Sequence, residues 1–155
     1  MIKKIKRIVK WIPIIWKIRD FDFIYAVNVF KFQLSNIADH LESENAYTTK
    51  GKEKAQRIRT TLALMEKVYN DDYGAEYIST IEDHYGKSQF VFTPLDSNPE
   101  LFELSIKYDT LYPEEQLTEI EEHRGKLLKE SAQKQAKAHR ILWKLIEQNI
   151  QGWWD

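Results

Sequence analysis

Residues 19–41 read RDFDFIYAVNVFKFQLSNIADHL, and they carry the clearest helical signal in the chain. Apolar side chains recur there at alternating spacings of four and three residues, which places them on one face of an α-helix. Asp20 or Asp22 is expected to cap the helix, because a short carboxylate accepts hydrogen bonds from the free N–H groups of a first turn. The segment therefore predicts a wide-faced helix at the centre of the fold. Its apolar face consists of Phe23, Val27, Phe30, Leu34, Ile37 and Leu41.

Two segments further along the chain repeat the same spacing. One spans about residues 49–70, and a shorter helix is expected after it, ending at Tyr85. The other begins at Pro113 and holds the spacing almost to Gln151, although its middle is polar. An unbroken helix of that length measures about 58 Å at about 1.5 Å per residue. It therefore either breaks near Gly125 or Ser131-Ala132, or projects and pairs with another chain. The polar middle favours the second alternative, a homo-oligomer.

The segment between these helices is the least helical part of the chain. Residues 86–98 are expected to form an irregular loop, in which residues 89–92 resemble an isolated strand, and one strand does not make a sheet. Asn98-Pro99 joins a capping residue to a proline suited to the first helical position, which predicts a helix from Pro99 to Asp109. The predicted fold class is all-α: a helical bundle of four to five helices with a long C-terminal helix and a basic N-terminal amphipathic segment.

Length and composition predict a single helical domain over residues 1–155. A chain of 155 residues buries roughly 68–70% of the surface that its unfolded form exposes, which is enough for its own core. Cysteine is absent, which excludes disulfide bonds, thiolate metal sites and a cysteine nucleophile. The apolar run at residues 11–16 is too short for a signal peptide, and no stretch approaches the ~20 apolar residues of a membrane span. These features predict a cytoplasmic protein without a transmembrane segment.

Charge is distributed unevenly along the chain. Residues 1–19 hold seven basic residues and no acidic one, whereas the whole chain has a formal net charge of −1. This basic amphipathic arm can make weak contact with an anionic membrane surface, or bind nucleic acid or another partner. In the interpretation that we favour from the sequence, its charges are solvated while one apolar stripe packs on the protein body. That stripe consists of Ile5, Val9, Ile12 and Trp16.

The last four residues, Gly152-Trp153-Trp154-Asp155, hold two adjacent tryptophans. Each tryptophan side chain buries roughly 150–250 Å² when it packs, so a pair of them is poorly suited to free solvent. Chain ends fray unless they are tied down. The tail is therefore expected to dock on the protein body.

The familiar catalytic and metal-binding patterns are missing from the sequence. Gly86-Lys87-Ser88 imitates the end of a phosphate-binding loop, but Ile81 stands where that loop requires its first glycine. No histidine follows a glutamate at the Glu-x-x-His spacing of helical di-metal sites. The acidic groups at residues 119–122 and 71–76 are expected to be solvated helix faces and helix ends. The sequence therefore predicts no catalytic residue, no metal site and no cofactor, and a protein that is not an enzyme.

Cationic and aromatic residues form the strongest candidate site. Phosphate groups are bound by Arg and Lys, and bases by a flat aromatic ring with amide or hydroxyl partners. Side chains of these types lie on three predicted helices, and they converge on one polar pocket if those helices pack as neighbours. The candidate ligand-binding residues are Tyr25, Asn28, Lys31, Arg57, Lys137, His139, Arg140 and Trp143.

Several short motifs are distinctive in combination. They are residues 19–25, 30–34 with 38–40, 70–73, 143–145 and 152–155. Together they resemble a family of small, mostly uncharacterised tailed-phage proteins with an Arg-Asp-x-Asp aromatic start and a Trp-Trp-Asp C-terminus. The resemblance covers about residues 16–85 and 135–155, whereas residues 86–130 match nothing in it. It implies a phage or prophage origin, a helical fold and expression inside a bacterium, and it supplies no catalytic residues.

The sequence and this resemblance support three functional hypotheses. The first is a phage-encoded accessory protein that binds and sequesters a nucleotide-like host immune signal. The second is a protein–protein interaction module, such as an inhibitor of a host protein or a virion or assembly component. The third is a nucleic-acid binder, whose affinity is expected to fall steeply with salt. An enzyme that uses the carboxylate groups as a metal site is the remaining alternative.

Overall fold

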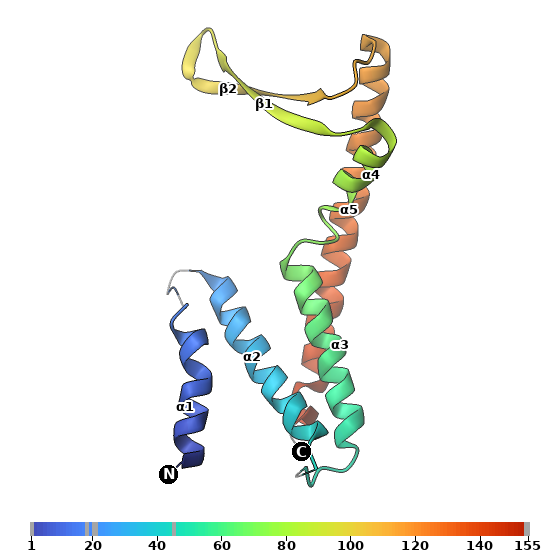
Figure 1. The fold of residues 1–155 in the computed structure, drawn as a ribbon. Coiled ribbons are helices and arrows are strands. Elements are labelled where there is room, and N and C mark those ends of the chain that lie inside the picture. Colours follow the sequence, from blue (N-terminus) through green and yellow to red (C-terminus); the bar gives the residue numbers. More distant parts are fainter. Residues whose placement is uncertain (1, 18, 20–21, 45, 154–155) are drawn as a thin grey trace. The chain divides into compact units, whose positions relative to one another are not determined.

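A computed structural model describes residues 2–17, 19, 22–44 and 46–153, with side chains from residue 4 onward in those ranges. The described residues form five α-helices, two β-strands and one short 3₁₀ helix (Figure 1). They are α1 (Ile2–Ile15), α2 (Phe23–Glu42), α3 (Gly51–Tyr69), α4 (Glu76–Tyr85), β1 (Ser88–Leu95), β2 (Asn98–Tyr108), α5 (Glu114–Asn149) and η1 (Ile150–Trp153).

The chain divides into two compact units, which are described separately below. Unit 1 comprises Met1–Asn70 together with Ala138–Asp155, and unit 2 comprises Asp71–Lys137. Helix α5 contributes its first part to unit 2 and its last part to unit 1.

The all-α prediction is wrong, because β1 and β2 form an antiparallel hairpin in unit 2 (Figure 1). The register sets Phe92 opposite Leu104, and it shifts between Pro94 and Leu95. The hairpin replaces both the irregular loop predicted for residues 86–98 and the helix predicted for residues 99–109. The fold is therefore mixed, with a small sheet in a molecule that is mainly helical.

Asn98 shows why the helix prediction failed. Its side-chain oxygen accepts a hydrogen bond from the backbone N–H of Glu100 at 3.1 Å. A helix cap makes the same kind of bond, but here it belongs to the turn between two strands. Apolar and polar side chains then alternate from Phe102 to Lys107, which is the period of a strand with one apolar face.

The helices elsewhere agree with the spacing of their apolar residues. Asp22 caps α2, since its carboxylate accepts from the backbone N–H of Ile24 at 3.0 Å; Asp20 lies outside the described residues. The long C-terminal helix is confirmed, because α5 runs unbroken for 36 residues, and the alternative of a break near Gly125 or Ser131-Ala132 is wrong. No helix within the described ranges is both long enough and apolar enough to cross a membrane.

The core of unit 1 lies between α2, α3, the last part of α5 and η1. The expected docking of the tail is confirmed for Trp153, which is only 2% exposed, whereas Trp154 and Asp155 lie outside the described residues. Ala38 and Ala55 are completely buried, and small side chains at such places let two helices approach closely. The largest core side chains of this unit are Leu34, Ile58, Met65, Leu142 and Trp153.

Helix α1 contacts α2 through a different face from the expected one. The Trp11 ring packs edge-on against Phe32 with 4.8 Å between ring centroids. Lys10 Nζ lies 3.8 Å from Asp39 Oδ2, which adds an ion pair on the same side of α1. The stripe that was expected to pack on the body is exposed instead, because the larger Trp11 ring and the Lys10 pair orient the helix. That stripe is Ile5, Val9, Ile12 and Trp16.

The core of unit 2 lies where the base of the hairpin meets α4 and α5. Ile81, Tyr108 and Ile120 are buried there. Arg124 lies beside them with its guanidinium 5.5 Å from the Tyr108 ring centre and its Nη2 3.2 Å from Ser88 Oγ. Burial raises the pKa of the Tyr108 hydroxyl above its usual value. This core holds the base of the hairpin and leaves its outer part uncovered.

Candidate functional site

The candidate residues do not meet at one place. Tyr25, Asn28 and Lys31 on α2 line one cavity of unit 1. Arg57 is exposed on α3, Lys137 belongs to unit 2, and the other three candidates lie on the part of α5 that belongs to unit 1. These three are His139, Arg140 and Trp143.

The cavity that Tyr25 lines, called here the smaller cavity, measures about 470 Å³. The Lys31 ammonium beside it is ion-paired with the Glu66 carboxylate, and this partner holds the pKa of Glu66 below its usual value. The charge of Lys31 is therefore largely compensated within the protein. The remaining lining is mostly apolar: it comprises Ile14, Lys17, Phe32, Ser35 and Leu62.

His139 and Trp143 interact with each other on α5. Trp143 Nε1 donates a hydrogen bond to His139 Nε2 at 3.2 Å, one helical turn away. The Tyr69 ring of α3 lies 6.4 Å from the His139 ring. Burial raises the pKa of the Tyr69 hydroxyl, and a hydrogen bond with Trp143 partly opposes that rise. These rings link α3 to the end of α5.

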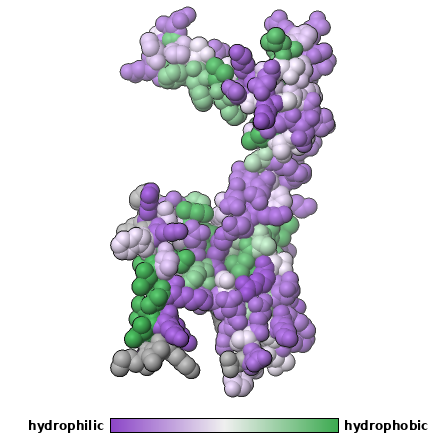
Figure 2. Space-filling view, viewed as in Figure 1, coloured by the Kyte–Doolittle hydropathy of each residue, from purple (hydrophilic) through white to green (hydrophobic). Residues whose placement is uncertain are grey.

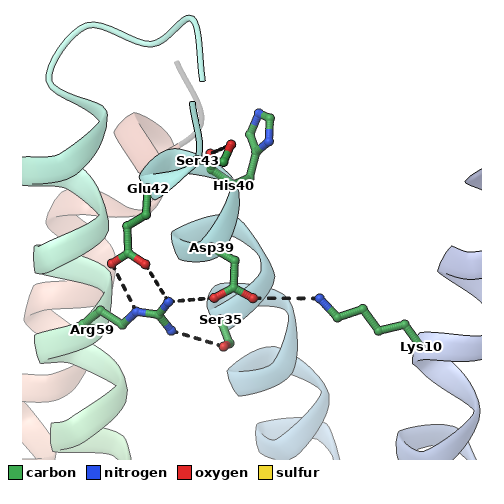
Figure 3. A network of polar contacts seen from close by, with 7 residues as sticks. All are labelled: Lys10, Ser35, Asp39, His40, Glu42, Ser43 and Arg59. Carbon is green, nitrogen blue, oxygen red and sulfur yellow. Dashed lines mark hydrogen bonds and ion pairs between the residues drawn. The ribbon is translucent and has the colours of Figure 1, made fainter. Parts of the chain in front are cut away.

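A network of charges around Arg59 connects α3 to α2 (Figure 3). The Arg59 guanidinium donates to Asp39 Oδ1 at 2.6 Å and to Glu42 Oε2 at 2.9 Å. Its Nη1 also lies within 3.3 Å of Ser35 Oγ. The two carboxylates raise the pKa of Arg59, so the guanidinium stays charged. Asp39 also pairs with Lys10, so the network extends to α1.

A second cavity of unit 1, called here the larger cavity, measures about 580 Å³. It lies where α1 faces α2, and residues of the loop after α2 and of η1 complete its wall. Its position depends on the Trp11 contact with Phe32 and on the Lys10 pair with Asp39, since both hold α1 against α2. The lining residues are Arg7, Lys10, Trp11, Gln33, Asn36, Ile37, His40, Leu41, Thr48 and Trp153.

The lining of the larger cavity combines the side-chain types that a nucleotide requires. Arg7 supplies a positive charge that can bind phosphate oxygens, and Lys10 supplies a second one that is shared with its ion-pair partner Asp39. Trp11 supplies a flat aromatic ring, against which a base can stack. The side chains of Gln33 and Asn36 supply amide donors and acceptors for the polar edge of a base.

Trp153 adds an unpaired donor to this wall. Its indole Nε1 is buried and has no hydrogen-bond acceptor among the described residues. An indole N–H can only donate, and most buried donors in proteins are paired. Trp153 therefore lines the larger cavity and also carries a buried donor that is unpaired among the described residues.

Sequence reasoning missed this site because its residues come from four separate segments: α1, α2, the loop after α2 and η1. The basic arm and the tryptophan tail were each recognised, but nothing in the sequence shows that both line one cavity. Within the described ranges, no group of three metal-ligating side chains is positioned to hold an ion.

No protein-family model, no curated protein and no solved structure matches this chain.

Proposed function

We propose that this protein is a non-enzymatic binding protein that holds a nucleotide-like small molecule in the larger cavity and acts by sequestering it. The observation that carries the proposal is the convergence of cations, indole rings and amides on one wall of unit 1. The resemblance to tailed-phage proteins extends the proposal to a host immune signal as the ligand and to the bacterial cytoplasm as the location. Sequestration requires only a preorganised pocket and no chemical step.

The lining residues suggest a division of tasks. Arg7 is the main phosphate-binding group, because α1 presents it to the cavity, and Lys10 assists it while also pairing with Asp39. The Trp11 indole stacks on the base, and Asn36 bonds to its edge.

Calorimetric titration with a panel of mono-, di- and cyclic nucleotides tests this assignment. Arg7→Ala is expected to weaken binding about tenfold or more, because a charge-assisted hydrogen bond contributes ~1.5–3 kcal/mol. Arg57→Ala and Arg140→Ala are the matched controls, since both remove an exposed arginine of unit 1 outside the wall of the larger cavity. Their affinities should equal that of the unmodified protein.

Two results would contradict the proposal. One is an Arg7→Ala protein that binds as tightly as the unmodified one. The other is a loss of affinity in Arg57→Ala and Arg140→Ala alone, which would return the site to the residues predicted from the sequence. Native mass spectrometry adds an independent check: a bound small molecule should be released on denaturation and absorb ultraviolet light as a nucleobase does.

A second candidate function, a protein–protein interaction module, is favoured by the outer part of the hairpin. Phe92 is 64% exposed, and its cross-strand partner Leu104 is exposed as well. Residues two apart on a strand share a face, and directly opposite residues share it too. This face, called here the hairpin face, consists of Phe90, Phe92, Pro94, Phe102, Leu104 and Ile106. Figure 2 shows hydrophobic side chains gathered on the hairpin.

The occupant that the hairpin face fits is a second copy of this chain. The face carries no charge, so two copies can stack without electrostatic repulsion, and a face that meets itself closes a two-fold dimer. It also continues from the core of unit 2, into which Ile106 packs. A two-stranded hairpin is marginal in water by itself, so covering this face also stabilises it.

Sedimentation velocity over a range of concentrations tests the dimer. Phe92→Lys is expected to make the protein monomeric, because it places a charge at the centre of the face. Thr93→Lys is the control, since Thr93 neighbours Phe92 on β1 but points to the opposite side of the sheet. A wild-type protein that is monomeric at every concentration, or equal behaviour of the two variants, would rule out the dimer.

A further inference from the structure

Helix α1 carries an apolar stripe that nothing in the described part of the protein covers. Six large side chains of α1 and the turn after it are between 50% and 87% exposed. Figure 2 shows hydrophobic side chains gathered along this helix. The stripe, called here the α1 stripe, consists of Ile5, Ile8, Val9, Ile12, Ile15 and Trp16.

The other side of α1 is already occupied by the protein. Trp11 packs on Phe32 of α2, and Arg7 and Lys10 line the larger cavity. At 3.6 residues per turn, the α1 stripe and these inward residues lie on different sides of the helix. Contact through the stripe therefore leaves both the α2 packing and the cavity in place.

Charge identifies the kind of surface that fits the stripe. Residues 1–19 hold seven basic residues and no acidic one, and the rest of the chain is net acidic. On the helical wheel, Lys4 and Lys6 fall on either border of the stripe. Long lysine side chains at such borders keep their ammonium groups in the headgroup region while their stems lie along apolar surface.

We propose that α1 is an interfacial helix that docks on an anionic lipid surface. The helix has 14 residues and is about 21 Å long at about 1.5 Å per residue, so it lies in the plane of the surface. The α1 stripe enters the boundary between headgroups and acyl chains, and the lysines bind the anionic headgroups. Trp16, at 87% exposure, supplies the ring type that is enriched at membrane interfaces.

Two other occupants fit the α1 stripe less well. A second copy would bring two basic helices together, and their like charges repel. A nucleic acid would engage the lysines through its phosphates, but it would leave six apolar side chains in water. Lipid is the partner that satisfies both the charge and the apolar face. This inference goes beyond the proposed function and does not depend on it.

Vesicle flotation with the full-length chain tests the proposal. The probes are vesicles of phosphatidylcholine mixed with phosphatidylglycerol, and vesicles of phosphatidylcholine alone. We expect binding to the anionic vesicles to exceed binding to the neutral ones by about tenfold or more, because several lysines act together. The double variant Ile8→Ser with Ile12→Ser should bind the anionic vesicles about tenfold more weakly than the unmodified protein, since it removes apolar area from the centre of the stripe.

The control is Leu128→Ser, which replaces a similarly exposed aliphatic residue on α5 and should float like the unmodified protein. Lys4→Glu with Lys6→Glu is a second variant, which should bind anionic vesicles weakly and leave the helix content by circular dichroism unchanged. Failure of the unmodified protein to float with anionic vesicles would overturn the proposal. So would full binding by the Ile8/Ile12 variant, and so would salt-sensitive binding to duplex DNA in place of vesicles.

Discussion

The α1 stripe and the hairpin face are both large, exposed and apolar, yet they differ in what surrounds them. The α1 stripe is bordered by lysines and lies on a segment without acidic residues. The hairpin face is uncharged, and it continues from the buried core formed around Ile81, Tyr108 and Ile120. Exposure alone therefore does not identify a partner. The charge at the border does: a basic border suits an anionic lipid, and a neutral face suits a copy of itself.

The comparison requires that both surfaces serve binding and that folding does not need them. Trp16 of the α1 stripe and the buried Trp153 make a matched pair for testing this. Trp153→Ala is expected to lower the free energy of unfolding by ~3–5 kcal/mol, because it removes a large side chain from the core. Trp16→Ala should change it by less than about 0.5 kcal/mol, as exposed substitutions usually do. Denaturant titration of both variants measures the difference.

Equal destabilisation by the two substitutions would break the comparison, because Trp16 would then belong to the folded core. A loss confined to Trp153→Ala would leave the α1 stripe free for a partner. Because Trp153 also lines the larger cavity, ligand affinity of that variant is informative only under conditions where circular dichroism shows it to be folded.

Ionic strength should change binding through the two surfaces differently, and this effect is expected to be smaller than that of Trp153→Ala. Raising the ionic strength is expected to weaken vesicle binding through α1 about tenfold, which corresponds to ~1.4 kcal/mol, because salt screens charged groups. Self-association through the hairpin face should stay the same or strengthen, since apolar burial does not depend on screening. Flotation and sedimentation in the same buffers make the measurement. Parallel responses of the two processes to salt would show that charge does not distinguish the surfaces.

The smallest expected effect is on stability at acidic pH, and it concerns the ion pair between Lys31 and Glu66. Lys31 binds Glu66, and the pKa of Glu66 is lowered in the folded protein, chiefly by this hydrogen bond. Its contribution to stability is therefore fully present above the unfolded pKa, ~4.3, and it is lost as the pH falls through the lower folded pKa. Because Glu66 is more than half exposed, the contribution should stay below about 1 kcal/mol.

Glu66→Gln should remove that part of the acid dependence while leaving vesicle binding unchanged. Thermal unfolding of the variant and the unmodified protein, followed across the acidic pH range, measures it. If Glu66→Gln instead increased binding to anionic vesicles, then Lys31 would belong to the basic surface around α1 and not to the interior of unit 1.

Local signals in the sequence predicted the helices well and the hairpin poorly. The spacing of apolar residues in α2 and α5 reflects contacts made along one helix face, which is a property of neighbouring residues. The hairpin depends on pairing Phe92 with Leu104, and the strand-like alternation of residues 102–107 was outweighed by the helix-start signal of Asn98-Pro99. Asn98 is the residue that misled the prediction, because its side-chain hydrogen bond to a backbone N–H can either begin a helix or close a turn.

The chemistry of the site was easier to predict than its location. Arg, Lys, aromatic and amide side chains were expected to converge, and the larger cavity brings together those types from other residues. Arg57 and Arg59 illustrate the difficulty. The two arginines lie only two positions apart on α3, yet Arg59 forms ion pairs with Asp39 and Glu42 while Arg57 is exposed. That choice depends on how α3 packs against α2, which the composition of either helix leaves open.

The distance along the chain between Trp11 and Trp153 has a consequence for when the larger cavity forms during folding. Contacts between residues so far apart close late in folding, because a long loop must lose its entropy first. During synthesis, the larger cavity is complete only after Trp153 has left the ribosome, although Arg7, Lys10 and Trp11 are made much earlier. A chain that stops before Trp153 would lack this part of the cavity wall.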